Sequence, residues 1–351
     1  MRKGKITILI FLFTAAFALV LDAGKRNEKV SFQINNATPL KFNIPAGWPK
    51  PPSNIFLNNP LTEEGFQLGR KLFYDGRLSK DGNFACASCH QQFAAFATYD
   101  HDLSHGFHDQ FTTRNAPPLF NLAWKKLYHW DGGINHIEVQ ALSPMTAANE
   151  MAENVDSVLL KLKKDTSYLR MFRSAFGSSL INSQRMLKAL AQFVGSITSS
   201  NSKYDKVKRG EDKFNSAEAH GYELYKLNCA ICHKEPLFTD NSYRNNGLPL
   251  NEYLKDFGRM RITGDPSDSL KFIVPSLRNV SVTFPYMHDG RLNSLYKVVD
   301  HYTSGIQPSS TLDSILRKPI LLSASEKNDL VYFLHTLKDT AFLNDKRFSQ
   351  P

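Results

Sequence analysis

Two short stretches decide the fold of this chain: "CASCH" at residues 86–90 and "CAICH" at residues 229–233. Each follows the pattern C-x-x-C-H, which is the attachment sequence for a c-type haem. The two thiols bond covalently to the haem, and the adjacent histidine binds the iron from one side. The predicted attachment and ligand residues are Cys86, Cys89 and His90 in the first motif and Cys229, Cys232 and His233 in the second. The sequence therefore predicts two covalently bound haem c groups.

Two other kinds of site also use paired cysteines. Four thiols from two C-x-x-C pairs can share one zinc ion, and a single pair can act as a redox dithiol. Neither alternative requires a histidine after both pairs, whereas haem attachment does. All four cysteines of the chain lie in these two motifs, and a histidine follows each of them. The repeated histidine therefore favours haem.

The sequence around the two motifs follows the same order twice. A helical pattern precedes each motif, with "GRKLF" at residues 69–73 and "GYELY" at 221–225. A second helical pattern comes much later, at 186–197 and at 325–337, where Ser325 is a candidate N-cap. We therefore predict a mainly α fold of two cytochrome c-like helical domains, each carrying one covalently attached c-type haem. The predicted domains span residues 24–200 and 201–351.

Composition and charge narrow the class of protein. The 351 residues are 42% hydrophobic and 12% aromatic, which is typical of a globular chain. The formal net charge is +10, but the basic residues are spread out and form no long run, so a nucleic-acid partner is not expected. A cationic surface instead favours encounters with acidic partners.

Residues 1–23 have the pattern of an export signal. Arg2, Lys3 and Lys5 form a basic start, and residues 6–21 form an uncharged, mostly apolar stretch. This stretch is shorter than the roughly 20 apolar residues of a membrane span. "AFA" at 16–18 and "LDA" at 21–23 are two competing cleavage sites. We expect an exported protein, which an uncleaved signal would anchor to the inner membrane.

Six further segments carry a specific resemblance. They are "LGRKLFYDGRLSKDGNFACASCH" at 68–90, "TRNAPPLFN" at 113–121, "WDGG" at 130–133, "ANEM" at 148–151, "VPSLRNV" at 274–280 and "PYMHDGR" at 285–291. From about residue 60 to the C-terminus, the chain resembles the bacterial di-haem cytochrome c peroxidase and MauG family. Single-haem cytochromes c lack this set of segments. The resemblance implies one haem that reacts with peroxide and one that relays electrons.

The resemblance assigns catalytic roles to Trp130, Gln140 and Glu150, which stand ten residues apart in each step. In the family a tryptophan lies between the haems, and a glutamine and a glutamate lie over the reactive iron. A partly buried glutamate with a raised pKa suits the proton transfer that peroxide cleavage needs. Taken singly, the three residues could equally be a core tryptophan, a surface glutamine and a helix-cap glutamate.

The resemblance also indicates the remaining axial ligands of the two irons. On the far side of the first haem, "HDLSHGFHDQ" at 101–110 offers three histidines. His105 fits best because Gly106 follows it, and Gly106 would let a gating loop move. The alternative is that these histidines face solvent in a polar loop.

For the second haem, the family's methionine position falls on Tyr302, fourteen residues after His288. MauG-like members carry a tyrosine there, and an anionic phenolate stabilises ferric iron. Met260, Met287 and His301 are the other candidates. Tyr302 lies in "SLYKVVDHYTSG" at 294–305, which reads as a helix ending at Gly305.

A calcium ion is typical of the family. The resemblance places the Asn115 side-chain oxygen and the Thr283 and Pro285 carbonyls around it, and such oxygen ligands suit a hard cation. The alternative is a turn that Asn115 holds without any ion.

These features together predict a peroxidase of the periplasm that reduces hydrogen peroxide to water. Its electrons would come from a small cytochrome c or cupredoxin through the C-terminal haem, and a homodimer is compatible with the sequence. One alternative is a MauG-like oxidase that uses a peroxide-derived high-valent haem to oxidise a protein or organic substrate. Another is a non-catalytic electron carrier or redox sensor.

Overall fold

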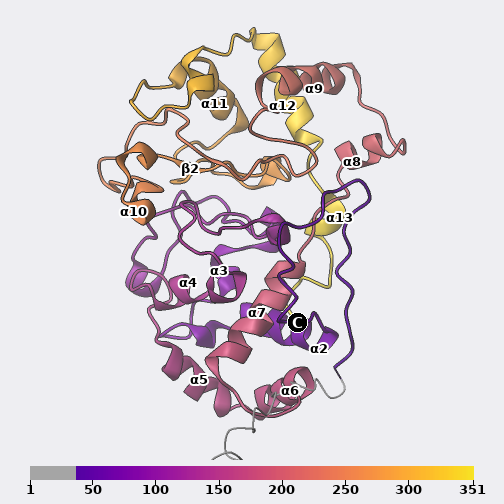
Figure 1. The fold of residues 1–351 in the computed structure, drawn as a ribbon, viewed down its shortest axis with the longest axis vertical. Coiled ribbons are helices and arrows are strands. Elements are labelled where there is room, and N and C mark those ends of the chain that lie inside the picture. Colours follow the sequence, from indigo (N-terminus) through magenta and orange to yellow (C-terminus); the bar gives the residue numbers. More distant parts are fainter. Residues whose placement is uncertain (1–36) are drawn as a thin grey trace, which may run out of the picture. The chain divides into compact units, whose positions relative to one another are not determined.

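The computed structural model describes residues 37–351 (Figure 1). The predicted export signal at residues 1–23 lies outside the described residues. The helices are α2 (Glu63–Phe73), α3 (Cys86–Cys89), α4 (Leu142–Thr146), α5 (Val155–Lys163), α6 (Thr166–Phe176), α7 (Ser183–Ser196), α8 (Lys203–Lys208), α9 (Ser216–Asn228), α10 (Met260–Thr263), α11 (Leu295–Asp300), α12 (Ala324–His335) and α13 (Thr340–Leu343). Two short strands, β1 (Tyr243–Arg244) and β2 (Phe272–Ile273), pair antiparallel. The predicted mainly α fold is confirmed.

Two helix pairs repeat the same packing. Helix α2 packs on α7, and α9 packs on α12. Each pair crosses at a glycine: a Cβ added at Gly69 would lie 2.0 Å from the Ala189 carbonyl oxygen, and one at Gly221 would lie 1.9 Å from that of Asp329. A glycine is needed because any side chain would collide with the facing backbone. The helix before each C-x-x-C-H motif thus meets the later helix predicted for it.

Capping side chains fix where these helices begin. Thr62 accepts a hydrogen bond from the Gly65 N–H and starts α2. Helix α12 starts at Ser323 and not at the predicted Ser325, because Ser323 and Glu326 form a reciprocal capping box. The sequence offers two serines two residues apart, and the glutamate three positions after Ser323 decides between them.

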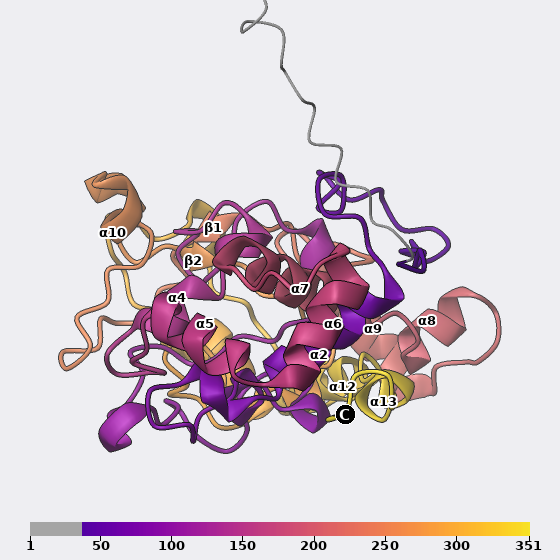
Figure 2. The same ribbon diagram turned by 90° about the horizontal axis from the view of Figure 1, so that it is seen from below.

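Two hydrophobic clusters form the interior of the compact unit of residues 36–351. The first contains α2 and α5–α7, and the second contains α9, α11 and α12. Phe342, Leu343 and Phe348, near the C-terminus, pack into the first cluster and not into the second. Figure 2 shows the C-terminal end of the chain beside α2, where Tyr74 donates a 2.7 Å hydrogen bond to the Phe348 carbonyl. The predicted division at residue 200 stays a prediction.

Hydrogen bonds and ion pairs join the segments around the two motifs. The Ile273 N–H in β2 donates to the Trp130 carbonyl at 2.8 Å, and the Asn115 N–H donates to the His288 carbonyl at 2.8 Å. Arg114 is paired with both Asp131 and Asp256 at 2.6 Å. Among residues 37–351, no helix is long and apolar enough to cross a membrane.

Candidate active site

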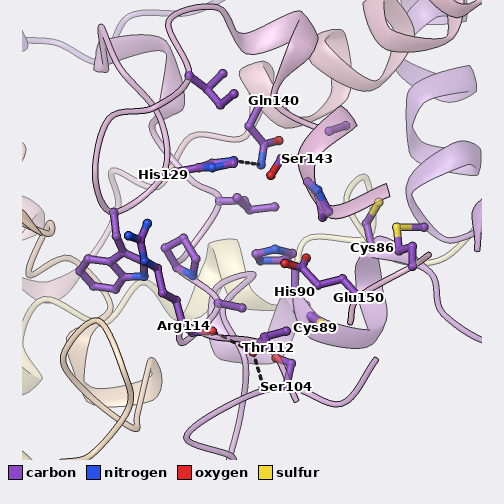
Figure 3. Close-up of a pocket in the computed structure, with 18 of the residues that line it drawn as sticks. Cys86, Cys89, His90, Ser104, Thr112, Arg114, His129, Gln140, Ser143 and Glu150 are labelled. Carbon is purple, nitrogen blue, oxygen red and sulfur yellow. Dashed lines mark hydrogen bonds between the residues drawn. The ribbon is translucent and has the colours of Figure 1, made fainter. Parts of the chain in front are cut away.

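The first C-x-x-C-H motif opens onto a cavity of about 470 Å³ (Figure 3). Helix α3 carries the two thiols, and the loop from Trp130 through α4 to Met151 covers the cavity. The lining includes Cys86, Cys89, His90, Trp130, Gln140 and Glu150. Pro144, in α4, also lines it. Residues that lie far apart in the sequence and were predicted to act together thus meet at one cavity.

His90 is oriented as a metal-binding histidine would be. Its Nδ1 lies 2.8 Å from the Phe96 carbonyl oxygen, which can only accept a hydrogen bond. The Nδ1 atom therefore carries the proton, and Nε2 keeps its lone pair for a metal. Burial lowers the pKa of His90 to about 4, so the ring is neutral at pH 7. Both properties fit a proximal ligand of a haem iron.

The second motif repeats this arrangement. His233 Nδ1 lies 3.0 Å from the Pro275 carbonyl oxygen, and Tyr225 donates a hydrogen bond to the His233 carbonyl. Burial raises the pKa of Cys86 and of Cys229 to about 12, and all four cysteines are free thiols. Two thiols and a correctly protonated histidine at each motif fit covalent haem attachment. Among the described residues, no group of three or more His, Cys, Asp or Glu side chains is arranged to hold a metal ion.

Glu150 brings a carboxyl group to the same cavity. It is half-buried, and burial raises its pKa above the usual value of 4.5. Figure 3 shows its side chain among the residues that line this cavity, which include His90. A raised pKa makes this carboxyl a better candidate for proton transfer than an exposed one.

Gly106 holds the histidine loop against Glu150. A Cβ added at Gly106 would lie 2.2 Å from the Asn149 carbonyl oxygen, and the Phe107 N–H donates to the Glu150 carbonyl at 2.7 Å. Gly106 has φ −127°, a backbone conformation open to any residue. The glycine is therefore required for close packing, and the expectation that it serves loop movement stays a prediction.

His105 lies at the rim of this cavity. Its side chain is exposed, and its ring contacts the rings of His101 and Phe111, at centroid distances of 5.6 and 4.5 Å. The structure thus places His105 within the loop that borders the cavity, among the polar residues of that loop. Its role as an iron ligand stays a prediction.

His129 is a site residue that the sequence reasoning missed. It lines the cavity, and its Nε2 lies 3.4 Å from the Gln140 side-chain nitrogen. Burial lowers the pKa of His129, which favours a neutral ring that can accept this hydrogen bond. The Gln140 amide nitrogen is then held by His129, and its oxygen is available to the cavity. Its position directly before Trp130 was the only signal in the sequence.

Trp130 lies between the two motifs. Its side chain is buried, and its indole N–H donates to the Asn115 carbonyl at 2.8 Å. Its own carbonyl accepts from Ile273 in β2, and β2 leads directly to Pro275, the partner of His233. Trp130 is thus connected through β2 to the ligand of the second site while its ring lines the cavity of the first.

Tyr302 lies at the second site in a π-helical turn, His301–Gly305, that follows α11. The predicted ordinary helix thus ends at Asp300, five residues before Gly305. Burial raises the pKa of Tyr302, and the nearby Cys229 and Cys232 thiols raise it further. Tyr302 also lines a second cavity, of about 320 Å³. Such π-helical turns are frequent at functional sites.

The other candidate ligands for the second iron are placed differently. His301 Nε2 lies 3.0 Å from the Asn246 carbonyl oxygen, so Nε2 carries the proton, and Nδ1, which keeps the lone pair, lies against Gly305 of the same turn. Met287 lies near Tyr302, because both contact the Asn246 side chain. Met260 begins α10, a short helix beyond β1. Tyr302 and Met287 are the candidates that the fold brings together.

The residues predicted to bind calcium lie in two adjoining loops. Asn115 Nδ2 lies 3.0 Å from the Asp102 carbonyl oxygen, and its backbone bonds to His288, close to Thr283 and Pro285 in sequence. These contacts hold the two loops together, and calcium binding between them stays a prediction. The Asn115 side-chain oxygen remains available.

Comparison with known proteins decides the family. Residues 63–213 match the family described as di-haem cytochrome c peroxidase. The methylamine utilization protein MauG of Methylorubrum extorquens is 37% identical over 331 residues, covering 92% of this chain and 91% of that protein. The cytochrome-c peroxidase IdrP1 of a Pseudomonas species (strain SCT) is 32% identical, covering 82% and 84%. This chain belongs to the di-haem cytochrome c peroxidase family.

A solved structure supports the same assignment for the fold. A MauG-like protein associated with microbial copper homeostasis superimposes with a TM-score of 0.81 at 33% identity, covering 89% of this chain and 99% of that one. The resemblance predicted from the sequence segments is confirmed. Like the named peroxidases of its family, the protein is an oxidoreductase, and membership implies haem c as its cofactor.

Proposed function

We propose that this family member is a di-haem peroxidase that reduces hydrogen peroxide to water with electrons that arrive through its C-terminal half. The observation that carries the proposal is the Glu150 carboxyl, which has a raised pKa and faces the same cavity as His90. Each half would form a cytochrome c-like domain with one covalent haem. Two matching C-x-x-C-H sites with correctly protonated histidines support this arrangement.

The haem-binding residues at the first site would be Cys86, Cys89 and His90, and at the second Cys229, Cys232 and His233. A haem held by these residues at the first site would supply the redox chemistry for peroxide reduction. The overall reaction is H₂O₂ + 2H⁺ + 2e⁻ → 2H₂O. The chain itself must therefore supply a proton route and an electron route.

Glu150 supplies the proton route. Its carboxylate would accept a proton from one peroxide oxygen and return it to the oxygen that leaves as water. Gln140 accepts a hydrogen bond from the peroxide through its side-chain oxygen, because His129 holds its nitrogen. Neither Gln140 nor the neutral His129 competes with Glu150 for the proton.

Trp130 and β2 supply the electron route. The indole ring lines the first cavity, and the Trp130 carbonyl bonds to the strand that leads to the partner of His233. Short covalent and hydrogen-bonded steps of this kind connect the two sites without crossing open space. A small cytochrome c or cupredoxin in the periplasm would be the electron donor, and the net charge of +10 suits an acidic one.

A MauG-like oxidation of a protein or organic substrate is the second candidate function. Tyr302 favours it, because a phenolate ligand at the second site lowers the reduction potential relative to a methionine. Both functions use Glu150 in the same way. They differ in whether electrons come from a redox protein or from the substrate that is oxidised.

Bound calcium would link the two adjoining loops through Asn115, Thr283 and Pro285. The contact between the Asn115 N–H and the His288 carbonyl supports their proximity. The proposal also includes two further points. The chain forms a homodimer, and residues 1–23 direct its export.

Replacing Glu150 by glutamine tests the function. Glu150→Gln keeps the shape of the side chain but removes its proton transfer, so peroxide turnover with a reduced small cytochrome should fall about 10²- to 10⁴-fold. Glu138→Gln is the matched control, because Glu138 does not line the cavity. Both variants should keep two haems per chain. Near-normal turnover in Glu150→Gln would contradict the assignment of Glu150.

Measuring peroxide turnover with small redox proteins as electron donors distinguishes the two candidate functions. Sustained peroxide reduction by the wild-type protein with a reduced cytochrome or cupredoxin is expected for the peroxidase. If the protein consumes peroxide but turns over with none of these donors, the oxidase becomes the better description.

A further inference from the structure

Asn246 contacts both side chains that the fold offers to the second iron. Its side-chain nitrogen lies 3.4 Å from the Tyr302 oxygen and 3.4 Å from the Met287 sulfur. The three residues are far apart in the sequence, so the fold alone brings them together. An amide NH₂ group carries two N–H donors, one for each of these acceptors.

Backbone contacts fix the orientation of this amide. The Leu248 N–H lies 3.2 Å from Asn246 Oδ1. A backbone N–H can only donate, so the atom facing Leu248 is the oxygen and the NH₂ group must face Tyr302 and Met287. His301 donates to the Asn246 carbonyl at 3.0 Å. The side chain and the main chain of Asn246 are therefore both held in place.

Hydrogen bonds from the amide to these two acceptors differ in strength. A hydrogen bond to an anionic oxygen is about twice as strong as one between neutral groups. A thioether sulfur is only a weak acceptor. The amide therefore stabilises an anionic Tyr302 oxygen much more than it affects the Met287 sulfur.

We propose that Asn246 is a positioning residue that selects Tyr302 over Met287 as the axial ligand of the second haem. This inference rests on the proposed function, in which Tyr302 binds that iron. A thioether ligand gives a higher reduction potential than an oxygen ligand. By its choice of ligand, Asn246 sets the potential at which electrons pass through the second site.

The test is Asn246→Asp in the haem-loaded protein. The aspartate keeps an oxygen for Leu248 but places a second oxygen, without a proton, against Tyr302. In low-temperature EPR of the ferric protein, the oxygen-ligand signal of the second haem should give way to a sulfur-ligand signal. The ratio of Tyr302-bound to Met287-bound protein should fall roughly tenfold or more, and the second reduction potential should rise. Adding Met287→Leu should abolish the sulfur signal.

Asn245→Asp is the matched control. It makes the same chemical change one residue earlier, where the Ser309 hydroxyl can donate to the new carboxylate. The second-haem signal should not change, and the first-haem signal reports folding in every sample. If Asn246→Asp and Asn246→Ala both fold and keep the oxygen signal, the proposal is overturned. If Tyr302→Phe leaves the wild-type signal unchanged, the proposed ligation by Tyr302 itself fails, and the selection by Asn246 with it.

Discussion

His90 and Glu150 face one cavity, and burial acts on both in the direction of the neutral form. It lowers the pKa of His90 to about 4 and raises the pKa of Glu150. A neutral histidine has a lone pair for iron, and a carboxyl with a raised pKa is a better proton donor and acceptor near pH 7. The same low-polarity environment thus prepares two different residues for two different tasks.

The raised pKa of Glu150 predicts a stability change in Glu150→Gln. A carboxyl group whose pKa is higher in the folded chain stabilises the fold only below its unfolded pKa, near 4.5, and this contribution is lost as the pH rises. At pH 7 the carboxylate therefore costs stability that the glutamine does not. Glu150→Gln should have the larger free energy of unfolding at pH 7, and the difference should shrink as the pH falls toward about 4.5.

Denaturant unfolding of the haem-loaded protein at several pH values measures this effect. Glu138→Gln, which does not line the cavity, should show no such pH-dependent gain. A wild-type protein more stable than Glu150→Gln at pH 7 would mean that the carboxylate has a favourable partner in the cavity.

Site residues could be predicted from the sequence where they belong to a pattern. The thiols and histidines stand at fixed spacing, and Trp130, Gln140 and Glu150 follow a family spacing. His129 and Asn246 belong to no such pattern. Asn246 acquires its role only when the fold brings it to Tyr302, 56 residues further along the chain. Contacts of that kind depend on tertiary structure, which local sequence does not encode.

At the scale of elements, the two glycine crossings are the most distinctive feature. They let α2 approach α7, and α9 approach α12, at backbone contact distance. Helix α9 ends at Asn228, directly before Cys229, whereas α2 ends at Phe73, before the loop that leads to Cys86. The sequence predicted a helix before and a helix after each motif, but not that the two helices cross at a glycine.

Gly221→Ala tests whether the crossing is essential. In an exposed helix this change should stabilise the chain by up to about 1 kcal/mol, because alanine favours helix. At the crossing, the added Cβ would collide with the Asp329 carbonyl oxygen at 1.9 Å. We expect a destabilisation of about 1–3 kcal/mol, typical of overpacking. The measurement is the change in the free energy of unfolding. A gain in stability in Gly221→Ala would contradict the close approach of the two helices.

Elements that short-range patterns do not specify were harder to predict. The π-helical turn at His301–Gly305 looked like the end of an ordinary helix, because the sequence shows the residues but not the hydrogen-bond shift. The start of α12 was wrong by two residues, since Ser323 and Ser325 are equally good caps until Glu326 is considered. The close approach of Gly106 to the Asn149 carbonyl could not be predicted either, because it joins residues 43 positions apart in the sequence.

At the scale of the whole molecule, the C-terminal segment ties the last residues to the first half. Phe348 is buried among aromatic rings that include Phe66 and Phe193, and the Tyr74 hydroxyl bonds to its carbonyl. The core behind the first haem site is thus completed by residues that follow the second site. The sequence reasoning assigned these residues to the second domain, because chain order gave no sign of their return.

Phe348→Ala should therefore disturb the first site. Removing a buried phenylalanine side chain costs about 3–5 kcal/mol. We expect a lower unfolding midpoint, with the absorption of the first haem changing before that of the second. Leu321→Ala is the control, because Leu321 is 83% exposed and lies outside both clusters. If the absorption of both haems changed together during unfolding, the two cores would unfold as one cooperative unit.

The return of the C-terminal segment also sets an order of assembly. A chain is synthesised from its N-terminus, so Phe342, Leu343 and Phe348 leave the ribosome after nearly everything else. The first C-x-x-C-H motif is made early, but the core behind it closes last. The second cluster has all its members once α12 and Leu337 have been made, whereas the first cluster, beside the first motif, still lacks Phe342, Leu343 and Phe348 at that point.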